Sequence, residues 1–169
     1  VQNVFNIIET FRNESVPIAF NDICVLSDNH EFLRQMEHYL RTTRHIEAET
    51  ISETQEEYDQ LCRIYQQNAF QQESFAWELN ELRRRRKCMF FMNPGIMKLC
   101  TVHSFKGWEI NTVVLILEPQ EEPELQDELI YTAITRAKNN LLIINLGNNR
   151  YHAFFEQKTR ERQANLMPF

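Results

Sequence analysis

Hydrophobic positions along the chain follow two alternating patterns, one with the spacing of a helix and one with that of a buried strand. Apolar residues recur at helical spacing from the start and predict an amphipathic opening helix: Val1, Val4, Phe5, Ile8 and Phe11. Further helices are expected over residues 32–40, 54–87, 123–137 and 151–163. Short apolar runs predict strands at residues 22–27, 46–51, 97–102, 112–118 and 140–145.

The longest helical region opens with a capping-box pattern. Thr54 is followed three residues later by Glu57, so each side chain is placed to bond the backbone N–H of the other. A break is expected near Asn68, and the region ends in the basic run of residues 83–87. Pro94-Gly95 then predicts a turn.

The alternation of strands and helices predicts the fold class. Such a chain forms a parallel sheet with helices on both faces, so we expect a single α/β domain over residues 1–169. Its sheet is expected to have about five strands, mostly parallel. Ligands of these sheets bind at the carboxyl ends of the strands, so the chemistry is expected directly after strands.

Composition narrows the class of protein. The 169 residues are 43% hydrophobic and 25% charged, as in an ordinary globular domain, and the formal net charge is −6. Free-standing nucleic-acid-binding domains are usually basic, so this balance argues against strong autonomous binding and leaves room for a few phosphate contacts. No apolar run is long enough to span a bilayer and no signal peptide is visible, so no membrane partner is expected.

The cysteines point to no metal site. Cys24, Cys62, Cys88 and Cys100 form neither a C-x-x-C pair nor a zinc-finger spacing. Cys24 and Cys100 lie in apolar strand-like runs and are expected in the core. Cysteines without such pairing favour a reduced, cytoplasmic protein.

A polar stretch between two predicted strands, residues 101–109, reads Thr-Val-His-Ser-Phe-Lys-Gly-Trp-Glu. It presents two hydroxyls, an imidazole, an ammonium and a carboxylate at one edge of the sheet. Gly107 permits a tight turn or a close backbone approach. Because such donors suit phosphate oxygens and a carboxylate suits a ribose hydroxyl, the stretch predicts contact with phosphates and sugars.

The second polar stretch, residues 129–138, reads Leu-Ile-Tyr-Thr-Ala-Ile-Thr-Arg-Ala-Lys. On a helix its apolar residues share one face: Leu129, Ile130, Ala133, Ile134 and Ala137. Arg136 then falls at the border of that face, anchored beside the core and pointing outward. An arginine placed in this way suits a phosphate across an interface.

Together these stretches resemble motifs V and VI of the UvrD/Rep/PcrA-type superfamily-1 DNA helicases, in the same order and spacing. Residues 23–26, with Arg34 and Glu37 on the next helix, are similar to the motif IV region. The resemblance covers about residues 22–145. It implies the C-terminal, second RecA-like motor domain of such a helicase, with the RecA-like (P-loop NTPase-like) α/β fold.

The resemblance also implies residue roles. Arg136 matches the arginine finger that stabilises charge on the γ-phosphate of ATP. The positions implied for nucleotide binding are Gly107, Glu109, Lys106 and Arg34. The positions implied for contact with single-stranded DNA are Thr101, His103 and Ser104. The family moves along DNA because ATP closes and opens the cleft between its two RecA-like domains.

The chain departs from the family in its phosphate loop. No G-x-x-x-x-G-K-[ST] sequence occurs. The family carries that loop and the Mg²⁺-binding acidic pair in its N-terminal RecA-like motor domain. The resemblance therefore implies that this chain needs that domain as a partner to hold ATP with Mg²⁺, and that it is inactive alone.

Two further departures concern motif IV and the insertion after it. Where the family commonly has an aromatic residue and an arginine, this chain has Ser27 and Asp28, and Asp28 is expected to repel phosphate. About residues 41–96 stand where many relatives carry a large accessory domain. That length predicts a reduced helical insertion.

Each of these residues also has an ordinary structural interpretation. Arg136 can join a surface ion pair with Glu128, and His103 can be a hydrogen-bonded structural residue. Lys106 can be a solvated loop lysine, and Glu109 can hydrogen-bond within its own loop. Phe105 and Trp108 are expected to pack the loop onto its sheet, although aromatic residues there can also stack on bases. For the basic run at residues 83–87 we expect a solvated helix end whose charge suits the helix dipole.

Two other functions compete with a motor domain. A degenerate helicase-like scaffold or regulator keeps the fold without cleft closure, and Asp28 and the acidic charge favour it slightly. An interaction module of the receiver or flavodoxin kind needs an acidic pocket or a flavin loop at the strand ends, and the sequence shows neither.

Overall fold

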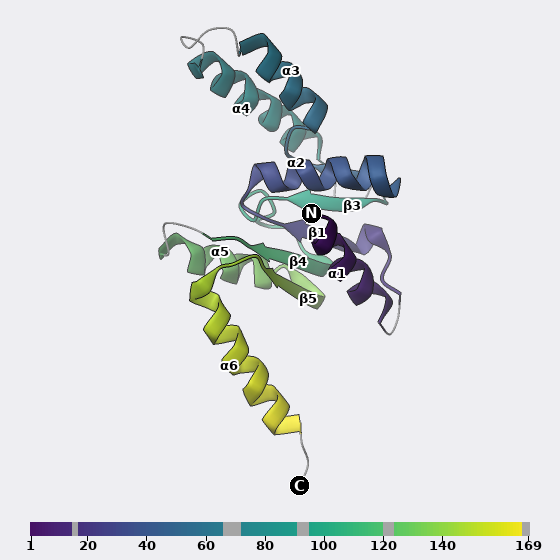
Figure 1. Ribbon diagram of the computed structural model, residues 1–169, viewed down its shortest axis with the longest axis vertical. Coiled ribbons are helices and arrows are strands. Elements are labelled where there is room, and N and C mark those ends of the chain that lie inside the picture. The colour runs from purple at the N-terminus through teal and green to yellow at the C-terminus, as the bar shows by residue number, and fades with distance from the viewer. Residues whose placement is uncertain (15–16, 66–71, 91–94, 120–123, 167–169) are drawn as a thin grey trace.

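The fold is built on one sheet of five parallel strands, in the order β2-β3-β1-β4-β5 (Figure 1). The computed structural model describes residues 1–14, 17–65, 72–90, 95–119 and 124–166. The strands are β1 (Ile23–Leu26), β2 (Ala48–Thr50), β3 (Met97–Cys100), β4 (Ile110–Leu117) and β5 (Ala137–Asn145). All five predicted strands are present and parallel, which confirms the expected α/β class and is consistent with a RecA-like fold.

Helices cover both faces of the sheet. They are α1 (Gln2–Asn13), α2 (His30–Tyr39), α3 (Gln55–Tyr65), α4 (Gln72–Met89), α5 (Glu124–Ile134) and α6 (Asn149–Leu166), with short turns η1 (Phe20–Asp22) and η2 (Leu40–Arg44). Helices α1 and α2 pack with Val25 and Leu99 on one face. Helix α5 packs with Cys24 and Cys100 on the other, so these two cysteines lie in the core as predicted. Among the described residues no helix is long and apolar enough to cross a membrane.

One predicted boundary is wrong. The helix expected to reach residue 137 ends at Ile134, and β5 begins at Ala137. The Ile110 N–H donates to the Arg136 carbonyl at 3.1 Å, and Ala137 pairs in register with Ile110. The backbone of residues 136 and 137, which helical periodicity assigned to the helix, is therefore hydrogen-bonded or paired to β4. Arg136 consequently lies in the short connection between α5 and β5.

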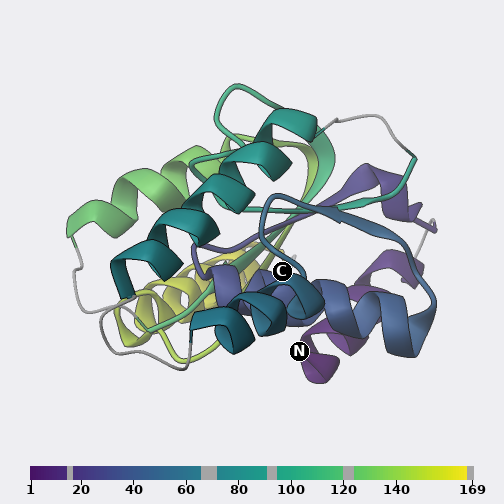
Figure 2. The same ribbon diagram turned by 90° about the horizontal axis from the view of Figure 1, so that it is seen from above.

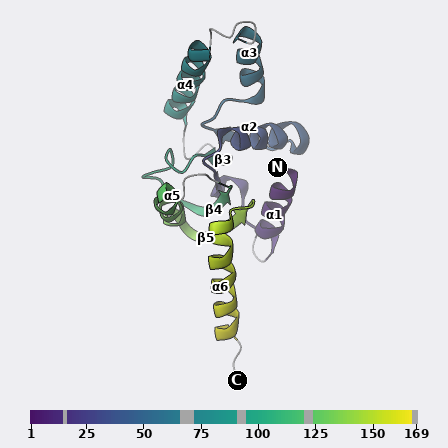
Figure 3. The same ribbon diagram turned by 60° about the vertical axis from the view of Figure 1, so that its left-hand side comes forward.

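Helices α3 and α4 form a hairpin that stands away from the sheet, as Figures 1 and 3 show. The two helices meet through edge-to-face aromatic contacts, with ring centroids 6.0 Å apart for Tyr58–Phe75 and 6.1 Å apart for Tyr65–Phe75. The break predicted near Asn68, like Pro94 of the predicted turn, lies outside the described residues. Figure 2 views the molecule from the hairpin side.

The predicted capping box is confirmed at the start of α3. The Thr54 N–H donates to Glu57 Oε2 at 2.8 Å, and the Glu57 N–H donates to Thr54 Oγ1 at 3.3 Å. We expect Thr54→Ala to lower the free energy of unfolding by about 1 kcal/mol, because one backbone donor of the first turn loses its partner. Urea denaturation measures this loss. Thr54→Ser is the control that should retain most of the stability, and equal stability of all three proteins contradicts the prediction.

Candidate functional site

The loop of residues 101–109 crosses the sheet from one edge to the other. It leaves the carboxyl end of β3 and enters the amino end of β4, and β1 lies between those two strands. Because the strands are parallel, the two ends of the loop must lie at opposite edges. We call the edge of the sheet formed by the carboxyl ends of the strands the carboxyl edge, and the edge formed by their amino ends the amino edge. Thr101 lies at the carboxyl edge and Glu109 at the amino edge. The expectation that this stretch presents all its polar side chains at one edge of the sheet, directly after a strand, is therefore wrong, and the predicted site residues divide into two groups.

At the carboxyl edge, the first residues of the loop form a turn held by their own hydroxyls. The Thr101 hydroxyl donates to Ser104 Oγ at 2.9 Å, and the Ser104 N–H donates to Thr101 Oγ1 at 3.3 Å. Thr101 is buried, Ser104 is half-buried, and His103 between them is exposed. This turn therefore fixes the backbone and presents the imidazole to solvent.

Two carboxylates lie at the same edge, on the strands next to this turn. Asp28 follows β1 and Glu118 follows β4. Burial raises the pKa of Asp28, and the nearby His103 and a hydrogen bond from the Val102 backbone oppose that shift. Burial also raises the pKa of Glu118, and the negative charge of Asp28 adds to the effect. The β1–β4 side of this edge is thus acidic, which disfavours phosphate there.

At the amino edge, Glu109 and Arg136 directly precede the neighbouring strands β4 and β5. The guanidinium of Arg136 donates to the Thr132 carbonyl at 3.2 Å and to Thr135 Oγ1 at 3.2 Å. None of the ion pairs found in the described part of the chain includes Arg136, so the alternative pairing with Glu128 does not form there. Among the described residues, the guanidinium of Arg136 has only neutral hydrogen-bond partners. It is available to an anion that approaches this edge.

A polar pocket of about 420 Å³ opens beside this group. Its lining residues are Asn21, Asp22, Gly95, Trp108, Glu109, Ile110, Asn111 and Lys138. The Glu109 carboxylate lies 4.0 Å from Lys138 Nζ, and more than half of each side chain is exposed. The described residues contain no group of three His, Cys, Asp or Glu side chains able to hold a metal ion. The donors here suit sugar and phosphate oxygens.

The loop itself is shaped by a glycine and a buried aromatic ring. Gly107 has φ +91°, in the region that side chains disfavour, and nothing lies near its Cα on the side where a Cβ would project. The glycine is therefore needed for the turn itself. Phe105 is fully buried, which confirms its predicted packing role, whereas Trp108 is 46% exposed and lines the pocket.

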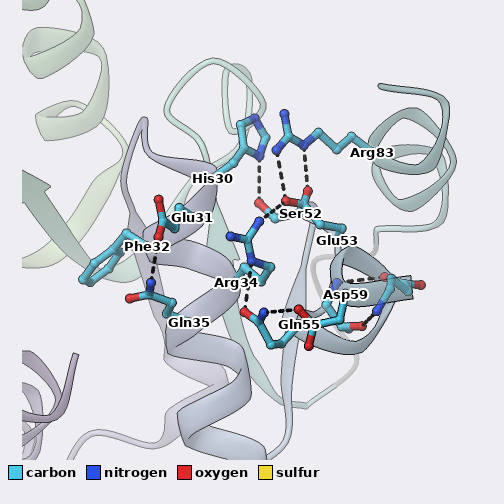
Figure 4. A network of polar contacts seen from close by, with 12 residues as sticks. His30, Glu31, Phe32, Arg34, Gln35, Ser52, Glu53, Gln55, Asp59 and Arg83 are labelled. Atoms are coloured by element: carbon cyan, nitrogen blue, oxygen red, sulfur yellow. Dashed lines mark hydrogen bonds and ion pairs between the residues drawn. The ribbon is translucent and has the colours of Figure 1, made fainter. Parts of the chain in front are cut away.

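Two residues implied for nucleotide contact do not join Glu109 and Arg136. Lys106 is exposed in the middle of the loop. Arg34 is buried within the fold, where its Nη1 donates to Glu53 Oε1 at 2.6 Å (Figure 4). Its guanidinium also lies 3.7 Å from the centre of the Tyr58 ring. Its charge is already compensated inside the protein.

The sequence interpretation missed Glu53, the residue at the centre of this polar network. Its side chain has no exposed surface and also accepts two hydrogen bonds from Arg83, at 2.7 and 3.0 Å. The available signal was its place just after a predicted strand, where polar residues of such sheets gather. The interpretation of residues 83–87 as a solvated helix end was wrong for Arg83 and for Arg86, which pairs with Glu57 at 2.8 Å. The other three residues of the run are exposed.

Comparison with known protein families finds a match in the segment that contains the crossing loop and Arg136. Residues 98–144 match the family described as UvrD-like helicase C-terminal domain. The matched segment begins in β3, includes the crossing loop, β4 and α5, and ends in β5. No curated protein matches the chain.

Proposed function

Because the chain contains a UvrD-type helicase C-terminal domain, we propose that it is the second motor domain of an ATP-dependent DNA helicase or translocase. In this proposal the amino edge of the sheet faces a nucleotide, and the carboxyl edge faces single-stranded DNA. The N-terminal motor domain of the same protein supplies the phosphate loop and the Mg²⁺ site. ATP hydrolysis therefore depends on both domains, and the chain has little activity alone.

The proposed nucleotide contact rests on the guanidinium of Arg136, which no carboxylate among the described residues compensates and which lies at the same edge of the sheet as Glu109. Arginine is suited to a terminal phosphate because its planar fork donates two parallel hydrogen bonds and stays charged. Arg136 donates to the γ-phosphate oxygens across the interface as negative charge develops there. Glu109 accepts a hydrogen bond from a ribose hydroxyl, and the turn at Gly107 lets the backbone approach the phosphates.

The crossing loop supplies the coupling between the two edges. A single segment of residues 101–109 carries Glu109 at one end and the Thr101–Ser104 turn at the other. A displacement of the amino edge when the cleft closes is therefore transmitted to the turn. Closure and opening of the cleft are the two states between which this loop moves.

The hairpin α3–α4 takes the place of a larger accessory domain. It lies within residues 41–96, and its described residues form the two helices α3 and α4. Its length is that of a reduced insertion in the motor domain. Any strand-separating element that relatives carry on a full accessory domain is therefore altered in this protein.

The proposed contact with single-stranded DNA is tested by the double substitution Thr101→Val and His103→Ala in the protein that carries both motor domains. We expect the concentration of single-stranded DNA needed for half-maximal stimulation of ATP turnover to rise about tenfold. The imidazole contact to the strand is lost, and the turn that presents it loses the hydrogen bonds of the Thr101 hydroxyl. Steady-state ATPase titrations with oligothymidylate measure it. His152→Ala on α6, an exposed histidine far along the chain, is the control. An unchanged half-maximal concentration in the double variant removes the turn from the DNA interface.

The competing proposal is a degenerate motor domain that serves as a scaffold. It was favoured by Asp28, which was expected to repel phosphate. Asp28 lies at the carboxyl edge beside His103, at the opposite edge of the sheet from Arg136. Its charge therefore does not oppose the proposed role of Arg136, and the motor proposal is the better supported of the two.

A further inference from the structure

The polar pocket at the amino edge extends across three neighbouring strands. Its lining residues include Asp22, which directly precedes β1, Glu109, which directly precedes β4, and Lys138, the second residue of β5. These strands stand in the order β1-β4-β5 (Figure 1). Since neighbouring strands are about 4.8 Å apart, the amino ends of β1 and β5 are separated by about 10 Å. That span and the pocket volume of about 420 Å³ suit a ligand larger than a sugar or a single phosphate.

The charged groups of this edge are segregated along that line. The acidic residues Asp22 and Glu109 stand at the amino ends of β1 and β4. The basic residues Arg136 and Lys138 belong to the start of β5 and the connection before it. Among the described residues, the loose contact of Glu109 with Lys138, at 4.0 Å, is the one ion pair between these groups. A ligand with its neutral part near β1 and its negative charge near β5 therefore fits this edge better than one in the reverse orientation.

The shape of the crossing loop holds an aromatic ring at this pocket. Phe105 is fully buried and fixes the loop to the sheet, and the Trp108 N–H donates to the Phe105 carbonyl at 3.1 Å. Gly107, between them, turns the chain with its φ of +91°. Trp108 consequently lines the pocket, 46% exposed and directly before Glu109. A flat apolar ring beside a carboxylate is suited to stack on a planar base whose sugar reaches that carboxylate.

Polar groups able to bond a base line the β1 side of the pocket. The Asn111 side chain donates to Asp22 Oδ1 at 3.2 Å and accepts from Asn139 at 3.3 Å, so its amide is held from both sides. Among the described residues, the other carboxylate oxygen of Asp22 and the side chain of Asn21 have no hydrogen-bond partner. Because a carboxylate accepts hydrogen bonds and repels carbonyl oxygens, this side favours a base that carries an amino group.

We propose that this pocket binds the base and the ribose of the nucleotide, with Trp108 stacking on the base and Asp22 accepting a hydrogen bond from its exocyclic amino group. The ribose then lies at Glu109, and the phosphates run past Lys138 toward Arg136. This orientation places the neutral rings beside the carboxylates and the phosphates beside the cations. The proposal rests on the assignment of Arg136 and Glu109 to the nucleotide, and it adds that the pocket prefers adenine to a base with a carbonyl oxygen in place of the amino group.

The stacking contact is tested by steady-state ATP turnover in the protein that carries both motor domains. Trp108→Ala should raise KM for ATP about tenfold and leave kcat nearly unchanged, since a base distant from the reacting phosphate is bound equally in the ground state and the transition state. Trp108→Phe keeps an aromatic ring and should retain most of the affinity. Trp77→Ala is the matched control, because it removes the other tryptophan, which is 65% exposed on α4. An unchanged KM in Trp108→Ala overturns the stacking contact.

The contact with the amino group is tested by the choice between ATP and inosine triphosphate, whose base has a carbonyl oxygen where adenine has the amino group. The unsubstituted protein should use ATP about tenfold better by kcat/KM, because the Asp22 carboxylate repels that oxygen. Asp22→Asn has an amide that can donate to the carbonyl, so it should lower this preference by about threefold or more. A general loss of structure lowers both values of kcat/KM alike. An unchanged ratio therefore overturns the role of Asp22.

Binding of the nucleoside itself is measured with the 169-residue chain. In a Trp77→Phe protein Trp108 is the one remaining tryptophan, so adenosine added at millimolar concentration should quench its fluorescence. Quenching together with full turnover of Arg136→Ala retains the pocket and removes the motor assignment on which it rests. No quenching and an unchanged KM of Trp108→Ala, with turnover lost in Arg136→Ala, exclude the pocket and leave the motor assignment standing.

Discussion

Replacing Arg136 with alanine is expected to lower single-strand-stimulated ATP turnover by about 10³-fold or more, with nucleotide affinity largely kept. The reason is that an arginine finger stabilises charge that develops mainly in the transition state, so its loss raises the barrier more than it weakens binding. The guanidinium is free for this role because, among the described residues, it bonds only the neutral Thr132 carbonyl and Thr135 hydroxyl. The measurement is steady-state turnover in the protein that carries both motor domains, with nucleotide binding measured by titration.

Two further substitutions control this result. Arg136→Lys keeps the charge and loses the planar fork, so it should restore only a small part of the turnover. Arg160→Ala removes an exposed arginine from α6 and should leave turnover as it is. If Arg136→Ala hydrolyses ATP at the unsubstituted rate, Arg136 is not a finger and the scaffold interpretation becomes the better one.

Replacing Glu53 with glutamine is expected to lower the free energy of unfolding by about 3–5 kcal/mol. This carboxylate has no exposed surface and holds both Arg34 and Arg83, so the substitution leaves two guanidiniums without their counter-charge. Such a loss is a large part of the stability of a domain of this size. Urea denaturation of the chain measures it, and we expect the hairpin α3–α4 to lose its attachment first, because Arg83 belongs to α4.

The same residue predicts how stability depends on pH. Burial by itself raises the pKa of Glu53, but hydrogen bonds from Arg83 and Arg34 hold it below the ordinary value of 4.5. A group whose pKa is lower in the folded than in the unfolded state stabilises the fold above the unfolded pKa. That contribution is lost as the pH falls through the folded pKa. The Glu53→Gln protein should therefore lose less stability than the unsubstituted chain when the pH is lowered from about 5 toward 3.

Glu57→Gln is the matched control for this prediction. Glu57 also pairs with an arginine of α4, but its side chain is 34% exposed and glutamine can still accept the capping-box hydrogen bond. We expect it to cost about 1 kcal/mol or less. Equal losses for the two variants contradict the central role assigned to the buried carboxylate.

Local patterns were sufficient to predict the secondary structure and the similarity of residues 98–144 to the UvrD-like helicase C-terminal domain family. Apolar runs and stripes located all five strands, and the Thr54–Glu57 spacing located the start of α3, because each of these depends on neighbours within a few residues. The residues of the crossing loop and the Thr-Arg-Ala sequence around Arg136 are likewise recognisable from the order of residues alone. The matched segment of residues 98–144 contains both.

The arrangement of the site depended on contacts between distant parts of the chain. Helical periodicity placed Arg136 on a helix, but pairing of β5 with β4 drew its backbone into the edge of the sheet beside Glu109. Arg34 matched a nucleotide position, yet Glu53 and Tyr58 bury it. Neither partner is near Arg34 in sequence.

By itself, the sequence determined which residues form strands and helices, since periodicity and capping act over short stretches of chain. The spacing of its motifs also supplied the residues that we propose for the chemistry. The tertiary structure alone decided that one loop joins the two edges of the sheet, because this follows from β1 lying between β3 and β4. It also decided which arginines remain free for ligands and which compensate Glu53. Strand order and the burial of particular side chains depend on packing between residues far apart in the sequence, so local patterns do not predict them.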